Sequence, residues 1–149
     1  MALIVSVSGI RGTLGGAPGQ GLTPVDVTAF AAAYGRWVLE RHPGHTPLVL
    51  LGQDARPSGR WLKGIAAHTL NAMGVATLDL TYITTPGMAL RVVHERAQGA
   101  ILFTASHNPI EWNGLKLFNE LGELISADDG TRILGYYQTQ DVHFATGAG

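Results

Sequence analysis

Apolar residues along the chain form short runs that alternate with longer segments of helical periodicity. A run of aliphatic residues that is bounded by glycine or polar residues is typical of a buried strand. Such runs predict strands at Leu3–Ser8, Leu48–Leu51, Val75–Tyr82 and Gly99–Thr104, and residues Leu115–Phe118 are strand-like. The run Leu48–Leu51 is wholly aliphatic, which indicates a strand covered on both faces.

Helices are expected between these runs. Thr23 as N-cap followed by Pro24 predicts the start of a helix, and apolar residues then recur at helical spacing until His42-Pro43-Gly44 ends it. Further helices are expected at residues 60–73 and 86–98. A last helix is expected after Ser126, which resembles the start of a capping box with Asp129. Strands that alternate with helices predict an α/β fold with a mostly parallel sheet.

Composition and charge narrow the class of protein. The 149 residues fit one domain, expected at residues 1–144 with a flexible tail at 145–149, and 46% hydrophobic against 14% charged residues indicates a packed core. A net charge of −1 without basic clusters argues against nucleic acid and membrane surfaces as partners. Cysteine is absent, which excludes thiolate zinc sites and disulfides. The sequence shows no signal peptide and no apolar run near the roughly 20 residues of a membrane span, so a cytoplasmic enzyme or part of one is expected.

Three polar loops each follow a predicted strand. They are Gly9–Gly12, Gly52–Gly59 and Thr104–Lys116. In sheets of this kind, ligands bind beyond the carboxyl ends of the strands, where such loops gather. We therefore expect the three loops to meet at one edge and to form the functional site.

The third loop carries the most chemistry. It contains Ser106 and His107, and the turn signal Asn113-Gly114 is expected to bring Lys116 back toward the serine. A hydroxyl with a cation and an imidazole nearby suits phosphoryl transfer, which requires positive charge around the transferred group. A hydrolase is disfavoured because His107 directly follows the serine and no G-x-S-x-G elbow is present. A nucleotide-binding loop is also disfavoured, because neither G-x-G-x-x-G nor G-x-x-x-x-G-K occurs in the glycine-rich residues 12–21.

These loops together resemble one known family. Thr104-Ala105-Ser106-His107-Asn108-Pro109 with Asn113-Gly114-Leu115-Lys116 is similar to the active-serine signature of the α-D-phosphohexomutases, which include phosphoglucomutase, phosphomannomutase and phosphoglucosamine mutase. Gly9-Ile10-Arg11-Gly12 resembles the N-terminal loop of that family, and the segment 52–59 resembles its G-x-D-x-R-x-S motif. The resemblance implies the first domain of such a mutase, a three-layer α/β/α sandwich.

The resemblance also implies roles for individual residues. Ser106 would carry the phosphoryl group, passing it to a hexose phosphate and recovering it from a hexose 1,6-bisphosphate. A Mg²⁺ ion would contact the phosphate on Ser106. Lys116 would be a general acid and base or a charge-stabilising group at the sugar hydroxyl, and His107 would be a second proton-transferring or hydrogen-bonding group there. Arg11 would reach the phosphoserine or the substrate from the first loop. The remaining motif residues would shape or brace the loops: Thr104, Ala105, Asn108, Asn113, Gly114, Asp54, Arg56 and Ser58.

The sequence also departs from the family. The metal-binding D-x-D-x-D-R loop of the second domain is absent, as are the sugar-selecting and phosphate-binding loops of the later domains, so the remaining mutase domains are expected as partners and turnover by this chain alone is not. The alternative is a stand-alone phosphate-binding or regulatory module without catalysis. Each residue also has a structural alternative. Ser106 would cap a turn, Arg11 and Arg56 would pair with acids, His107 would bond to backbone, and Lys116 would be a solvated edge charge.

Overall fold

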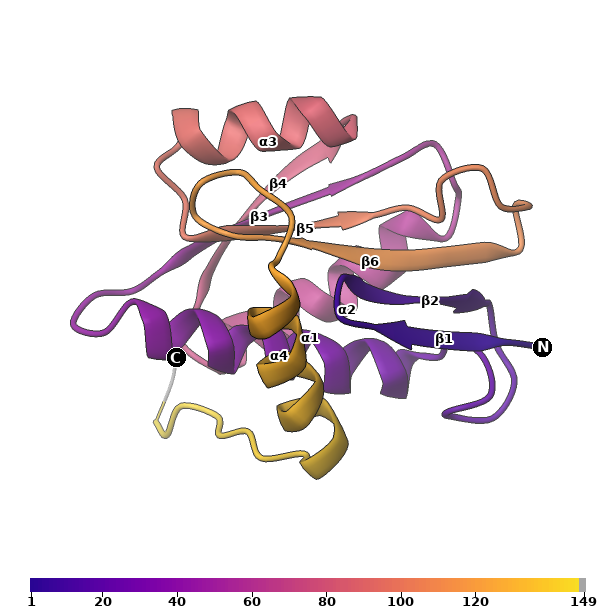
Figure 1. Ribbon diagram of the computed structural model, residues 1–149, viewed down its shortest axis with the longest axis horizontal. Coiled ribbons are helices and arrows are strands. Elements are labelled where there is room, and N and C mark those ends of the chain that lie inside the picture. Colours follow the sequence, from indigo (N-terminus) through magenta and orange to yellow (C-terminus); the bar gives the residue numbers. More distant parts are fainter. Residues whose placement is uncertain (148–149) are drawn as a thin grey trace.

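A six-stranded sheet forms the centre of the protein (Figure 1). The computed structural model describes residues 1–147. The strand order is β1-β2-β6-β5-β3-β4. The strands are β1 (Leu3–Ser6), β2 (Gly9–Thr13), β3 (Leu48–Gln53), β4 (Ala76–Tyr82), β5 (Gly99–Phe103) and β6 (Trp112–Phe118). The helices are α1 (Pro24–Arg41), α2 (Gly59–Ala72), α3 (Thr85–His94) and α4 (Ala127–Thr139).

The elements form the three layers expected of an α/β/α sandwich. Helices α1, α2 and α4 cover one face of the sheet and α3 covers part of the other (Figure 1). Alternate residues of β3 show this division, because Leu51 belongs to the larger core with α1 and α2, whereas Leu50 packs with Met88 of α3. On the α3 side of the sheet, no helix of residues 1–147 lies over β1 and β2 (Figure 1).

Strand direction places the carboxyl ends of four strands at one edge. Strand β3 pairs in parallel with β4 and β5, β5 pairs antiparallel with β6, and β6 pairs antiparallel with β2. It follows that β2, β3, β4 and β5 run in one direction, while β6 and β1 run in the other. The sheet is therefore mixed, with a parallel majority.

The predicted helix starts are confirmed. Thr23 caps α1 in a capping box with Asp26, and Ser126 caps α4 by accepting a hydrogen bond from the Asp129 amide. Helix α3 is shorter than predicted, because it ends at His94 and Arg96 adopts a positive φ of 53°. Helical periodicity over residues 86–98 did not reveal this left-handed residue.

The N-terminal segment differs from the prediction. Residues 3–8 were expected to form one strand and residues 9–12 a loop, but the chain turns at Val7-Ser8 and forms the β1–β2 hairpin. Gly9 follows this turn with a φ of 147°, and its missing side chain lets β2 lie against β6, since a Cβ there would be 2.0 Å from the Leu115 carbonyl oxygen.

The prediction of a turn at Asn113-Gly114 was wrong. Both residues lie inside β6, where they pair with Gly12 and Arg11 of β2. The glycine permits close strand contact, because a Cβ on Gly114 would be 2.5 Å from the Ile10 carbonyl oxygen.

The last described residues run back along α1 and α2. The Ala145 amide donates to the Ala72 carbonyl oxygen at 2.9 Å. Residues 148 and 149 of the predicted tail lie outside the described residues. No helix within residues 1–147 combines the length and the apolar character that a bilayer crossing requires.

Candidate active site

Two of the three predicted loops and Arg11 meet at one edge of the sheet. The Asp54 amide, just beyond β3, donates to the Phe103 carbonyl oxygen at the end of β5 at 3.1 Å. The Thr104 amide donates to the carbonyl oxygen of Gly114 at 3.1 Å, and Gly114 is the β6 partner of Arg11. The segments that carry the sequence motifs therefore adjoin one another, although Arg11 lies on strand β2 rather than on a loop.

Ser106 has an unusual backbone conformation. Its φ is 54°, in the left-handed region that few residues other than glycine adopt. Its amide donates to Thr104 Oγ1 at 3.0 Å, and its carbonyl oxygen accepts from Arg56 Nη2 at 2.9 Å. Asn108 closes the turn, since both its amide, at 3.1 Å, and its Nδ2, at 2.9 Å, donate to the Ala105 carbonyl oxygen. Left-handed residues of this kind gather at functional sites, where the surrounding structure holds them.

Polar side chains join the second loop to the third. Thr104 Oγ1 donates to Asp54 Oδ2 at 2.8 Å, and Asn113 Nδ2 donates to Ser58 Oγ at 2.8 Å. Asn113 and Ser58 are buried, so this second bond is shielded from competing water. The first contact fixes the second loop against the third, and the second fixes the start of α2 against β6.

A hollow of about 180 Å³ lies beside Ser106 on the sheet face without a covering helix. Two cationic side chains, Arg11 and Lys116, border it together with Ser106, and no aspartate or glutamate lines it. The other lining residues are Ile4, Ser6, Ser8, Gly9, Ile10, Thr104, Ala105 and Leu115. Arg11 is exposed and Lys116 is half-buried, and neither forms an ion pair within residues 1–147. A hollow that a serine and two cationic residues border, and that no carboxylate lines, is a suitable place for a phosphate dianion.

Comparison with known proteins agrees with this arrangement. Residues 3–143 match the family model described as phosphoglucomutase/phosphomannomutase, alpha/beta/alpha domain I. The chain belongs to this family.

Individual relatives of this phosphoglucomutase/phosphomannomutase domain are longer proteins. The phosphoglucosamine mutases of Verminephrobacter eiseniae and Polaromonas naphthalenivorans are 38% and 40% identical to it over 118 residues, or 79% of the chain. The chain spans only about a quarter of their length, 25% and 26% respectively. The crystal structure of a putative phosphomannomutase from Thermus thermophilus superposes with a TM-score of 0.78 at 27% identity, over 91% of this chain and 30% of that one.

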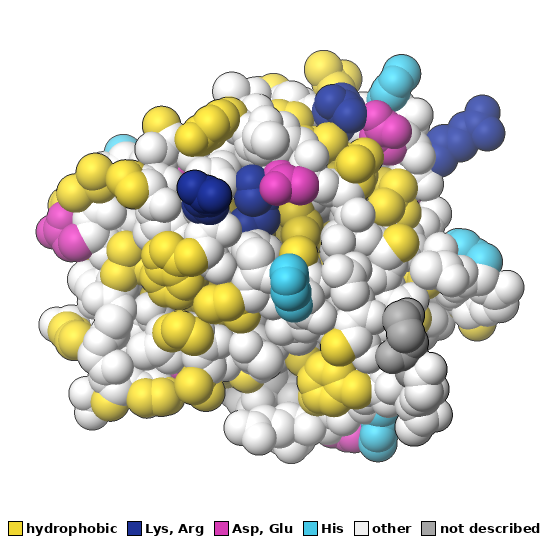
Figure 2. Space-filling model, turned by 180° about the vertical axis from the view of Figure 1, so that it is seen from behind, with side chains coloured by type: hydrophobic (Ala, Val, Ile, Leu, Met, Phe, Trp, Pro, Cys, Tyr) yellow, Lys and Arg dark blue, Asp and Glu magenta, His cyan; other side chains and the backbone are white. Residues whose placement is uncertain are grey.

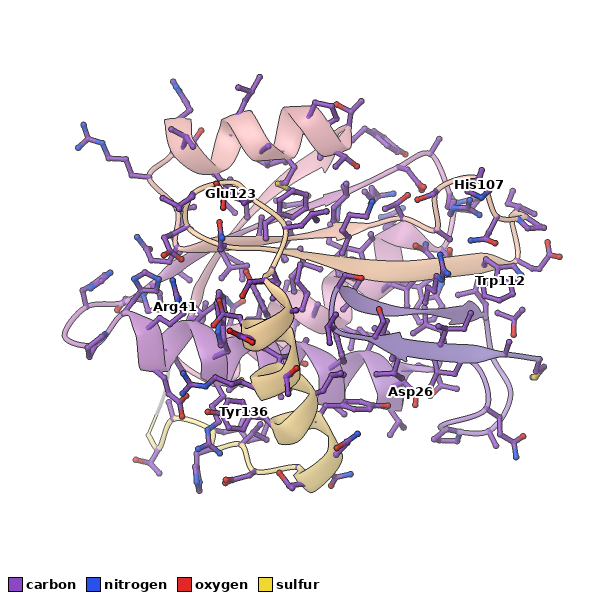
Figure 3. All side chains as sticks on the ribbon, viewed as in Figure 1. Asp26, Arg41, His107, Trp112, Glu123 and Tyr136 are labelled. Carbon is purple, nitrogen blue, oxygen red and sulfur yellow. The ribbon has the colours of Figure 1, made fainter. Side chains whose placement is uncertain are left out.

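The phosphohexomutase motif residues are not all in one place. Arg11, Thr104, Ala105, Ser106 and Lys116 line the hollow. His107 does not line it; it is exposed on the connection between β5 and β6, as is visible in Figure 3, where Trp112 marks the start of β6. The structure thus brings Lys116 and Arg11 to the hollow that Ser106 lines and leaves His107 outside it.

A second hollow next to Ser106 was missed in the sequence. It measures about 600 Å³ and is bordered by the connection between β4 and α3, including the exposed Tyr82 and the residues Thr84 and Thr85. Ser106 and Thr104 line both hollows. The sequence could have indicated this hollow. The predicted strand Val75–Tyr82 is parallel to β3, so the residues that follow it lie at the same end of the sheet as the loop after β3.

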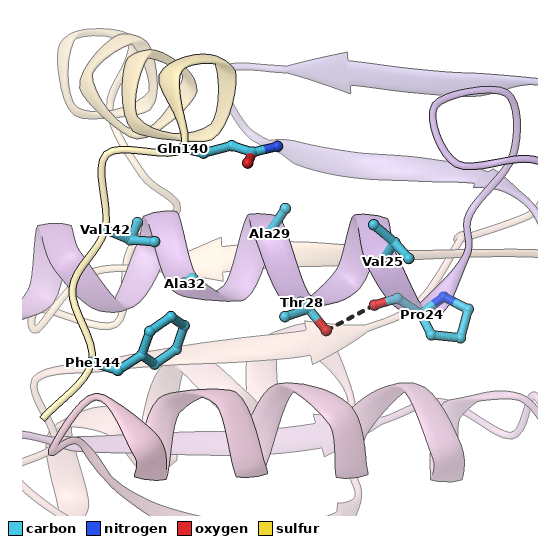
Figure 4. Close-up of a pocket in the computed structure, with 8 residues that line it drawn as sticks. All are labelled: Pro24, Val25, Thr28, Ala29, Ala32, Gln140, Val142 and Phe144. Atoms are coloured by element: carbon cyan, nitrogen blue, oxygen red, sulfur yellow. Dashed lines mark hydrogen bonds between the residues drawn. The ribbon is translucent and has the colours of Figure 1, made fainter. Parts of the chain in front are cut away.

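Other surfaces offer less for this chemistry. A mainly apolar hollow of about 400 Å³ lies between α1 and the C-terminal segment, and Ala29 and Ala32 of α1 line it together with Val142 and Phe144 (Figure 4). None of the motif residues lines it. On the face seen from behind, hydrophobic side chains form separate groups and charged side chains are few (Figure 2). That face therefore carries no continuous basic stripe.

Proposed function

We propose that Ser106 is the phosphoryl carrier of a phosphohexomutase. In this reaction a phosphoryl group moves between O1 and O6 of a hexose phosphate through a bisphosphate intermediate. The observation that supports the proposal most strongly is the hollow that Ser106 lines together with Arg11 and Lys116. Membership in the phosphoglucomutase/phosphomannomutase family supports the reaction class.

The transfer balances with the residues of this hollow. In the first half, a hydroxyl oxygen of the hexose phosphate bonds to phosphorus while the bond between phosphorus and Ser106 Oγ breaks. The Lys116 ammonium donates a proton to the departing serine oxygen, and the amine so formed takes the proton of the attacking hydroxyl, so the products are a hexose bisphosphate, a free serine and the restored ammonium. The second half reverses these steps with the other phosphate of the bisphosphate. Lys116 suits this role because it borders the same hollow as Ser106.

Arg11 and His107 have separate tasks in this proposal. Arg11 binds the non-bridging phosphate oxygens, where its positive charge offsets the charge that spreads over them during transfer. His107 is exposed outside the hollow and would hydrogen-bond a part of the sugar there. This arrangement predicts a larger catalytic loss for changes at Lys116 than for changes at His107.

The described residues do not fit a Mg²⁺ site on their own. Within residues 1–147 no cluster of three or more His, Asp or Glu side chains has a metal-binding arrangement. Asp54, the carboxylate beside the Ser106 loop, already accepts hydrogen bonds from Arg56 and Thr104. A Mg²⁺ ion at the phosphate of Ser106 would need carboxylates from other mutase domains, and no step above depends on it.

The proposed partners follow from the length of the relatives. Since the chain spans about a quarter of the phosphoglucosamine mutases it matches, we infer that further mutase domains complete the site and select the sugar. The chain alone would then accept a phosphoryl group slowly and would show little turnover. A hexose phosphate is the substrate class supported by the names of the relatives.

Intact-mass measurement tests the carrier role directly. After incubation with a hexose 1,6-bisphosphate and Mg²⁺, the chain should gain about 80 Da, the mass of one phosphoryl group. Ser106→Ala should abolish the gain, whereas Ser8→Ala, which changes another serine of the same hollow, should keep it. A gain that persists in Ser106→Ala would disprove the assignment. A chain that binds hexose phosphate but never gains mass would instead be a phosphate-binding module.

A further inference from the structure

Arg56 donates hydrogen bonds from every N–H group of its guanidinium. An arginine side chain has five such donors in a planar fork. Their acceptors are Asp54 Oδ2 at 3.2 Å and the carbonyl oxygens of Ser106 at 2.9 Å, Asn108 at 2.6 Å, Pro109 at 2.5 Å and Trp112 at 3.0 Å. Four of the five acceptors therefore belong to residues 106–112, which form the Ser106 loop and the first residue of β6, some fifty residues further along the chain.

The surroundings of Arg56 favour a structural position over a free surface charge. Its side chain is only 10% exposed, and Asp54 supplies the single carboxylate partner. The Asp54 carboxylate also accepts from the Arg56 backbone amide, which fixes the pair locally. With all donors in use, the guanidinium has none left for a phosphate. Lysine would not replace it, since an ammonium has three donors and no planar fork.

Both backbone groups of Ser106 connect to this pair. The carbonyl oxygen accepts directly from Arg56. The amide donates to Thr104 Oγ1, and Thr104 Oγ1 donates onward to Asp54 Oδ2 at 2.8 Å. The left-handed φ of 54° at Ser106 is therefore held from both sides by one ion pair. A residue other than glycine stays in the left-handed conformation only where the surrounding structure holds it there.

We infer that the Asp54–Arg56 pair is the positioning device of the site. It keeps Ser106 left-handed and keeps the serine side chain at the cationic hollow, which is the one that Arg11 and Lys116 border. Arg56 is thus a positioning residue that acts through the backbone of the Ser106 loop. The conformational part of this inference is independent of phosphoryl transfer. Its catalytic consequence rests on the proposed carrier role of Ser106.

Backbone NMR of the chain tests the conformational part. In Arg56→Lys, the backbone chemical shifts of Ser106 should move toward those of an ordinary serine, and amide exchange across residues 106–112 should accelerate at least tenfold. The matched control is Arg60→Lys, an exposed arginine four residues later, which should leave both readouts unchanged. Unchanged Ser106 shifts in Arg56→Lys would overturn the inference.

A second pair of variants serves if Arg56→Lys fails to fold. Thr104→Val removes the oxygen that connects the Ser106 amide to Asp54, whereas Thr104→Ser retains it. We expect Thr104→Val to change the Ser106 shifts and Thr104→Ser to restore them. Equal spectra for the two variants would contradict a positioning role of the Asp54–Arg56 pair.

Charging with hexose 1,6-bisphosphate separates the two proposals. Arg56→Lys should slow phosphorylation of Ser106 at least tenfold while the hollow still binds inorganic phosphate with unchanged affinity. An equal loss of both would mean that Arg56 supports the hollow as a whole and does not specifically position Ser106. If the unaltered chain is never phosphorylated but Arg56→Lys changes the Ser106 shifts as expected, the carrier role of Ser106 fails and the positioning role of the Asp54–Arg56 pair stands.

Discussion

The hydroxyl of Tyr34 offers a quantitative test of how the sheet that carries the site is packed. This side chain of α1 is fully buried, and its hydroxyl donates to the Phe118 carbonyl oxygen at 2.7 Å and lies 3.3 Å from that of Ala100. Ala100 and Phe118 are paired residues of β5 and β6. The neighbouring Gly99 leaves the space for this hydroxyl, since a Cβ there would be 2.0 Å from it.

These contacts determine how much two substitutions should lower the free energy of unfolding. Gly99→Ala forces the hydroxyl away, so it combines overpacking with a weakened buried hydrogen bond, and we expect it to lower the free energy of unfolding by about 2–4 kcal/mol. Tyr34→Phe loses the hydrogen bond alone and should cost about 1–2 kcal/mol. In the double variant the nearest ring atom, Cζ, is 3.1 Å from the new Cβ, a distance that small shifts can accommodate.

The two costs should therefore overlap. Urea denaturation of the chain, both single variants and the double variant should show a double-variant loss smaller than the sum of the single losses by about 1–2 kcal/mol. Strict additivity would refute the packing argument, because it would mean that the hydroxyl of Tyr34 does not compete with a side chain at residue 99. Gly64→Ala, where an added Cβ meets no atom within 4 Å, is the control for a glycine-to-alanine change.

Three other predictions follow from the remaining contacts. Burial lowers the pKa of His42, whose Nε2 is 3.8 Å from Glu120 Oε2, so the unfolded chain protonates first as the pH falls below about 6.5, the ordinary histidine value. The free energy of unfolding should thus decrease as the pH falls from about 6.5 through the lower pKa of folded His42. In urea denaturation between pH 7.5 and 5.5, His42→Gln should show a smaller decrease than the unaltered chain. Equal decreases would contradict the lowered pKa of His42. Asp26→Ala removes the acceptor of the Thr23 amide in the capping box and should cost about 1–2 kcal/mol in the same assay, whereas an unchanged midpoint would show that the cap contributes nothing. Lys116→Met should weaken binding of inorganic phosphate about ten- to hundredfold in an NMR titration, since a charge-assisted hydrogen bond is worth about 1.5–3 kcal/mol, and an unaltered affinity would place the phosphate elsewhere.

Local signals explain why much of the fold could be predicted. The aliphatic runs of β3 and β5 and the N-caps of α1 and α4 depend on residues within a few positions of one another. The strand-end rule then placed the second and third loops together, as the bond from the Asp54 amide to Phe103 confirms.

The failures share a different cause. Asn113-Gly114 has the composition of a turn, but its glycine is needed where β2 and β6 approach closely, and the sequence between them does not reveal that contact. The β1–β2 hairpin was missed because Val7-Ser8 is not one of the pairs, such as Asn-Gly or Asp-Gly, that mark a two-residue hairpin turn. Tertiary contacts decided both.

The site shows the same limit. A motif could name Arg56 as a brace, but the number of its hydrogen bonds depends on carbonyl groups of residues 106–112 whose directions only the folded loop defines. Equally, the sequence placed His107 beside Ser106 along the chain, whereas the turn directs it outside the hollow that Arg11 and Lys116 share.

The most direct test of the central claim is a ³¹P NMR pH titration of the chain with phosphoserine at position 106, obtained by charging or by incorporation during synthesis. An ordinary phosphoserine loses its second proton with a pKa of about 6. If the phosphate lies between Arg11 and Lys116, their charges favour the dianion, so the midpoint should be clearly lower and should rise again in Arg11→Met. A midpoint at or above the ordinary value, unaffected by Arg11→Met, would show that the phosphate of Ser106 does not occupy the cationic hollow.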